Sequence, residues 1–287
     1  MENVSYPAPV DKLLTYGKPE LAYAENWPNY LELGFTPEHI PDLIRMATDK
    51  ELNEADPESL EVWGPVHAWR TLGQLHAETA VEPLLHLYEE MSDDDWAVSE
   101  LPRVYGMIGP AAIPILKAYV ADASHDESAR INAQTGLEEI GTMHPDARNE
   151  CIAALSQQLE LFEENDPGLN GYLIASLVGL EALEAVPLIE RAFAADRVDE
   201  FITGDWDSVQ VELGLKEAPP ERPMLLDPFE RRGQPISPDQ IKIVTPGVMA
   251  TPNPRYFSSG TPGNRKTSQK AKNKMVKQSR KKNRKRR

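Results

Sequence analysis

The stretch AWRTLGQLHAETAVEPLLHLY (68–88) decides the fold, because three later segments repeat its pattern. These copies are LPRVYGMIGPAAIPILKAYV (101–120), AQTGLEEIGTMHPDARNECIAAL (133–155) and LIASLVGLEALEAVPLIERAF (173–193). Two apolar positions recur in all four segments, at intervals of 33, 32 and 40 residues: Leu72, Tyr105, Leu137 and Leu177 at the first, and Leu75, Ile108, Ile140 and Leu180 at the second. A proline follows six to eight residues later in three copies, as Pro83, Pro114 and Pro187.

Each copy predicts a helix, a short turn and a second helix that begins near the proline. A more distant copy, YLELGFTPEHIPDLIRMA (30–47), precedes them. One such hairpin cannot bury both of its apolar faces, whereas four or five stacked hairpins bury a continuous core. Apolar residues keep the three- and four-residue spacing of helices from Leu13 to Leu215, without a strand or hairpin signal. We therefore predict an all-α domain over residues 1–215.

The segments LGQL and YGMIG, each followed by a turn and then AVEPLL or AIPIL, resemble HEAT-like repeats of the phycobilisome-lyase type. The wider text, including NYLELGFTPEHIPDLIRMATDKELNE and AADRVDEFITGDWDSVQVELGL, is similar to a group of bacterial HEAT-like proteins of unknown function. This resemblance covers residues 29–215. It implies an α-solenoid of stacked helical hairpins, but no single activity, since such arrays serve many roles.

Capping residues predict where several helices begin and end. Thr36, followed by proline, predicts a helix start, and Asp56 before Pro57 predicts another. Asp94 and Asp95 suit the positive end of a helix that begins near them. Gly214 is expected to stop the last helix.

The charge of the chain changes sharply along its length. Residues 216–263 hold ten of the 25 prolines, which predicts an extended connector. Residues 264–287 hold 13 of the 30 basic residues and none of the 46 acidic ones, so the remaining residues carry 17 basic against 46 acidic side chains. We expect this basic tail to be disordered on its own, because like charges repel and little of it is apolar.

A polycation of this kind is typical of a phosphate-binding arm. The tail lacks aromatic residues, so we expect electrostatic binding without base stacking, with RNA or the ribosome favoured over DNA. The acidic domain is a competing polyanion, and a tail that serves only solubility is the alternative. The residues predicted to contact nucleic acid are Lys270, Lys272, Lys274, Lys277, Arg280, Lys281, Lys282, Arg284, Lys285, Arg286 and Arg287.

Composition narrows the remaining chemistry. A single cysteine, Cys151, excludes an internal disulfide and a cysteine-based zinc cluster, and it suits a reducing cytoplasm. The N-terminus lacks the basic start of a signal peptide, and no segment reaches about 20 apolar residues, so we expect a cytoplasmic protein without a membrane partner. The histidines, among them His67, His76 and His86, lack metal-ligand spacing and are expected at surfaces or helix ends. We predict no metal and no cofactor.

The acidic clusters are better suited to binding than to catalysis, because acids at helix starts usually serve the helix dipole and solubility. Tryptophans beside two of them are candidate anchors in a negative field, with core packing as the alternative. The residues predicted to bind a protein partner are Asp94, Asp95, Trp96, Asp205, Trp206 and Asp207.

Three functional hypotheses follow. The first is a non-enzymatic scaffold that binds a protein partner through the repeats and RNA through the tail. The second, which the resemblance implies, is a chromophore lyase or isomerase. The third is an interaction module whose tail only aids solubility. The oligomeric state stays open.

Overall fold

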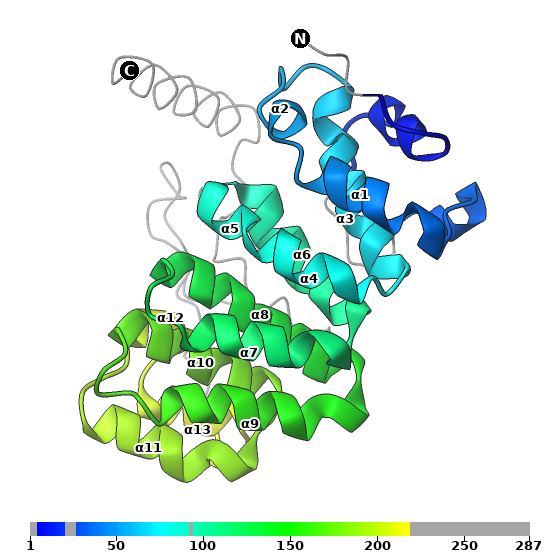
Figure 1. The fold of residues 1–287 in the computed structure, drawn as a ribbon. Coiled ribbons are helices and arrows are strands. Elements are labelled where there is room, and N and C mark those ends of the chain that lie inside the picture. The colour runs from blue at the N-terminus through cyan, green and yellow to red at the C-terminus, as the bar shows by residue number, and fades with distance from the viewer. Residues whose placement is uncertain (1–4, 21–26, 92–93, 219–287) are drawn as a thin grey trace, which may run out of the picture. The chain divides into compact units, whose positions relative to one another are not determined.

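The computed structural model describes residues 5–20, 27–91 and 94–218, which form helices and turns without a strand (Figure 1). The chain divides into two units, Met1–Pro219 and Pro220–Arg287, and every described residue lies in the first. The all-α prediction is confirmed for these residues. The connector from residue 219 onward and the basic tail lie outside the described part of the chain.

Four helix pairs follow one another along the chain. The first helices of the pairs are α3 (Gly64–Gln74), α6 (Asp95–Ile108), α8 (Glu127–Met143) and α10 (Pro167–Gly179). The second helices are α4 and α5 (Val81–Leu85 and Leu87–Glu90), α7 (Ile113–Ala121), α9 (Arg148–Leu159) and α11 (Val186–Ala194). Pro83, Pro114 and Pro187 lie in the first turn of α4, α7 and α11, as the sequence predicted.

The turn inside each pair has a recurring construction. A 3₁₀ turn precedes each second helix: η6 (Glu78–Ala80), η7 (Pro110–Ala112), η8 (Pro145–Ala147) and η9 (Leu183–Ala185). In the first and fourth pairs the backbone N–H groups of Ala77 and Ala182 donate to the carbonyls of Leu72 and Leu177, at 3.0 and 2.9 Å. These bonds are those of a Schellman motif, which satisfies carbonyls that the helix end leaves free.

The recurring apolar positions lie in one continuous core. Leu72, Tyr105, Leu137 and Leu177 are all buried, and Ile108, Ile140 and Leu180 are buried at the second position. The 3₁₀ turns each end on a buried alanine: Ala80, Ala112, Ala147 and Ala185. The apolar positions that recur in the sequence are therefore the positions that pack into the core.

Successive pairs pack first helix against first helix. Helix α3 contacts α6, α6 contacts α8, and α8 contacts α10, while α7, α9 and α11 form a neighbouring row (Figure 1). Gly106 allows one close approach, because a Cβ at this position would lie 3.0 Å from the Cβ of Glu139 on α8. Of the described residues, no single helix is long and apolar enough to cross a membrane; α6 with residues 110–121 has the length and composition only as a pair bent by 111°.

Shorter elements flank the four pairs. Before them come η1 (Val10–Thr15), η3 (Tyr30–Leu33), η4 (Pro37–His39), α1 (Ile40–Ala47), α2 (Lys50–Asn53) and η5 (Glu61–Trp63). After them come α12 (Glu200–Thr203) and α13 (Trp206–Glu212).

The capping predictions can be compared with these bounds. Thr36 is the N-cap of η4 within a capping box, and Gly214, with a φ of 71°, follows the end of α13, as predicted. The predicted helix start at Asp56 is wrong. The Asp56 carboxylate accepts from the backbone N–H of Glu58 at 3.0 Å, and the chain makes turns there until η5 begins at Glu61.

A buried ion pair joins the first two pairs. The Arg70 guanidinium on α3 donates from Nε and Nη2 to the two carboxylate oxygens of Glu100 on α6, at 2.9 and 2.8 Å. Arg70 also donates to the carbonyl of Glu20 at 2.8 Å and lies over the Trp27 ring at 4.7 Å. The two side chains are 2% and 0% exposed, so the pair is strongly coupled to the packing of α3, α6 and the N-terminal segment.

We predict that Glu100→Leu lowers the free energy of unfolding by about 3–5 kcal/mol, because it leaves the buried Arg70 charge uncompensated. The double variant Arg70→Met/Glu100→Leu should recover a large part of this loss. Urea unfolding monitored by helical circular dichroism measures both effects. The matched control is Glu160→Gln, which removes an ion pair with Arg191 whose side chains are 53% and 58% exposed, and it should change stability by less than about 1 kcal/mol. Equal losses in Glu100→Leu and the control would contradict a structural role for the buried pair.

Candidate functional site

The first predicted binding cluster lies at the start of α6. Asp94 is the N-cap, and its carboxylate accepts from the backbone N–H groups of Trp96 and Ala97, both at 2.9 Å. Trp96 is half-buried and packs edge-on against Trp63, with 5.2 Å between ring centroids. Asp95 is exposed. The helix start predicted at these aspartates is confirmed, and the cluster has a structural role beside any role in binding.

The second predicted cluster lies at the start of α13. The Asp205 carboxylate accepts from the N–H and the hydroxyl of Ser208, at 2.8 and 2.6 Å, and these hydrogen bonds lower the pKa of Asp205. Trp206 is half-buried against Phe193, and Asp207 pairs with Lys216 at 2.5 Å. Helices α6 and α13 pack on different neighbours, so the structure does not combine the two clusters in one site. The predicted basic contacts of the tail lie outside the described residues.

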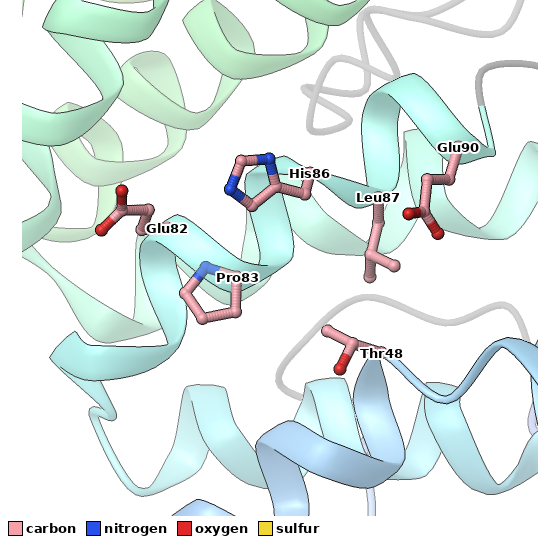
Figure 2. Close-up of a pocket in the computed structure, with 6 residues that line it drawn as sticks. All are labelled: Thr48, Glu82, Pro83, His86, Leu87 and Glu90. Atoms are coloured by element: carbon pink, nitrogen blue, oxygen red, sulfur yellow. The ribbon is translucent and has the colours of Figure 1, made fainter.

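A groove near the N-terminal end of the repeats brings other residues together. It is an open hollow of about 430 Å³, lined by Thr48, Glu82, Pro83, His86, Leu87 and Glu90. Figure 2 shows Thr48 on one wall facing Leu87 on the other, with His86 between Glu82 and Glu90 along the helix. Thr48 caps the C-terminal end of α1, and α1 contacts α4.

The helical repeat explains why these side chains share one face. Glu82, His86 and Glu90 recur every four residues through α4 and α5, so they lie one above another on the exposed side. Val81, Leu84 and Leu85 face the core. Leu87 is 2% exposed and lines the wall opposite Thr48. The i, i+4, i+8 spacing is readable in the sequence, but only the packing of α1 against α4 reveals the facing wall.

The arrangement suits binding of a cationic ligand with an apolar part. Two exposed carboxylates lie at the ends of the row, and the half-buried Pro83 offers an apolar surface between them, with the buried Leu87 also lining the hollow. Such a groove matches a peptide segment in which an apolar side chain lies between basic ones. Among the described residues no group of three or more His, Cys, Asp or Glu side chains is placed to hold a metal ion.

The histidine prediction is correct in part. His86 is exposed, and His76 lies at a helix end, where its Nδ1 contacts the Met107 carbonyl at 2.5 Å. His67 contradicts the prediction, because it lies in the middle of α3 with 4% exposure. Its ring is satisfied by two buried hydrogen bonds, to Tyr30 and to the carbonyl of Gly17. Cys151 is fully buried, and burial raises the pKa of its thiol to about 11, which disfavours a nucleophilic role.

No protein-family model, curated protein or solved structure matches this chain, so the site is argued from its own residues.

Proposed function

We propose that this protein is a non-enzymatic scaffold whose helix pairs form a HEAT-like solenoid that binds a protein partner, and whose basic tail binds RNA. The observation that carries the proposal is that a helix pair recurs four times, each with a 3₁₀ turn before its second helix and with successive first helices packed on one another. An array of this kind presents its turns and one row of helices as an extended binding surface.

The partner is expected to be basic where it meets the repeats. Outside residues 264–287, acidic side chains outnumber basic ones by 46 to 17. The groove is lined by two carboxylates, Glu82 and Glu90, and by the apolar side chains of Pro83 and Leu87. The negative field of the domain would steer such a basic partner towards it. One apolar side chain of the partner would then bind in the groove.

The lyase alternative has less support from the described residues. Its most plausible nucleophile, Cys151, lies in the core with a raised pKa. Asp94 and Asp205, one in each predicted cluster, hydrogen-bond to the N-termini of their helices. A scaffold needs neither an activated nucleophile nor a pair of carboxylates with separated pKa values.

We predict that Glu82→Gln/Glu90→Gln reduces capture of the protein partner at least tenfold, because both carboxylates face the same bound segment. The full-length protein, tagged and incubated with nuclease-treated native lysate, is compared with the variant by quantitative mass spectrometry. Glu190→Gln/Glu212→Gln is the matched control, since it removes the same charge from exposed positions on α11 and α13. Equal capture by the two variants would show that net charge, and not the groove, recruits the partner.

We predict that the logarithm of the RNA affinity of the full-length protein falls linearly with the logarithm of the salt concentration. The slope should be about −0.7 for each phosphate contacted on single-stranded RNA. Replacing Arg280, Lys281, Lys282, Arg284, Lys285, Arg286 and Arg287 with glutamine should flatten this slope, because seven of the 13 tail cations are removed. Fluorescence polarisation of labelled single-stranded RNA at several salt concentrations measures both slopes. The groove variant Glu82→Gln/Glu90→Gln is the control and should keep the wild-type slope. If the tail variant binds as the wild type does, the tail is not the RNA-binding arm.

A further inference from the structure

His67 connects helix α3 to the N-terminal segment, defined here as residues 5–20 and 27–36. Its Nδ1 lies 2.6 Å from the hydroxyl of Tyr30, and its Nε2 lies 2.8 Å from the carbonyl oxygen of Gly17. Both partners belong to the N-terminal segment, while the ring itself is 4% exposed on α3. One imidazole on α3 therefore makes two hydrogen bonds to the N-terminal segment.

The partners fix the protonation state of this ring. A carbonyl oxygen only accepts, so Nε2 carries the hydrogen and donates it to Gly17. In the neutral imidazole Nδ1 is then an acceptor, and the Tyr30 hydroxyl donates to it. Protonation would place a second hydrogen on Nδ1, directed at a phenol oxygen whose own hydrogen would lose its acceptor. Tyr30 is fully buried, so water cannot replace that acceptor without opening the segment.

Among the groups around His67, the Arg70 charge also disfavours protonation. Arg70 lies one turn along α3, and Tyr16 and Tyr30 face the ring from the N-terminal segment, with centroid distances of 5.5 and 5.9 Å. The carboxylate of Glu100 on α6 has both oxygens engaged by Arg70. On α1, which also packs on α3, the charged side chains Asp42 and Arg45 pair with each other at 3.0 Å.

We propose that His67 is a pH-sensitive latch that holds the N-terminal segment on α3 when neutral and loosens it when protonated. The proposal rests on the two buried hydrogen bonds of the ring: the neutral tautomer also accepts the Tyr30 O–H, whereas the imidazolium leaves that buried O–H without its acceptor. Burial, with a contribution from Arg70, lowers the pKa of His67 despite the opposing effect of the Gly17 hydrogen bond. The segment thus has its full attachment above about pH 6.5, the ordinary histidine value, and loses attachment progressively as pH falls from there towards the lower pKa of the closed state.

Apolar contacts limit how far the segment opens. Val10, Leu13 and Tyr30 are fully buried, so the closed state remains the major one near neutral pH. Between the two pKa values the ratio of open to closed segment should rise up to about tenfold for each pH unit lost. Native-state hydrogen exchange detects such minor open states.

The test is hydrogen exchange of the full-length protein between about pH 5 and 7.5, read by mass spectrometry and corrected for the intrinsic chemical rate. Peptides covering 10–17 and 30–36 should lose protection by up to about tenfold per pH unit below about 6.5, relative to peptides from α9 and α10. An equal pH response in the two regions would overturn the proposal.

Variants separate the latch from general acid sensitivity. His67→Gln keeps a donor and an acceptor but cannot gain a proton, so the excess pH response of the N-terminal peptides should disappear. His86→Gln removes an exposed histidine and should leave the excess response unchanged. Where His67→Gln does not fold, Tyr30→Phe leaves Nδ1 without a partner in either protonation state, so protection of the N-terminal peptides should already be lower than wild type at pH 7.5. A wild-type pH response in His67→Gln, or wild-type protection at pH 7.5 in Tyr30→Phe, contradicts the latch.

Discussion

The bidentate pairing of Arg70 with Glu100 is the constraint on which the N-terminal half of this fold depends. Each partner lies on the first helix of a different pair, and neither reaches solvent. Neither charge can be left alone in the core, because an uncompensated buried charge costs several kcal/mol. The contact therefore fixes the register of α3 against α6 through two directed hydrogen bonds, whereas apolar burial by itself is non-directional. The carbonyl of Glu20 and the Trp27 ring then extend this register to the N-terminal segment.

Further along the chain, side-chain hydrogen bonds to helix ends and a buried amide network take the place of a buried ion pair. Arg148 on α9 donates to the carbonyls of Leu180 and Glu181, at 2.8 and 2.9 Å, and so caps the end of α10. Asn165 and Asn170 hydrogen-bond to each other at 2.9 Å in a buried amide network between α9 and α10. Local capping thus carries out at this end what one ion pair does at the other.

The sequence allowed the repeat positions to be predicted because they follow a simple physical rule. Leu72, Tyr105, Leu137 and Leu177 are apolar at a fixed interval, and such residues are buried wherever helices stack. The caps at Thr36 and Asp94 were predictable for the same local reason. The helix start predicted at Asp56 was wrong because an Asp-Pro pair also initiates turns. Whether a turn or a helix forms there depends on packing against residues distant in the sequence.

Buried polar residues could not be placed in this way. Arg70 and His67 lie on α3 among residues that are nearly all buried. An isolated polar residue in a helical sequence is ordinarily expected on the solvent-exposed face. Their partners, Glu100 and Tyr30, lie 30 and 37 residues away, so the pairing emerges only from tertiary contact. The groove was missed for a similar reason, since Thr48 follows α1, Leu87 lies on α5, and α2, α3 and α4 come between them in the chain.

The position of the groove has a mechanical consequence. One wall belongs to α1, which precedes the four pairs, and the other belongs to α4 and α5 within the first pair. The width of the groove therefore depends on the distance between α1 and the first helix pair, and a tilt of α1 on α3 changes that width. A molecule that contacts both walls stabilises one relative position of α1 and the first pair. Because coupling between two binding events is reciprocal, a second ligand that favours the same position increases the affinity for this molecule by the same factor by which this molecule increases the affinity for that ligand.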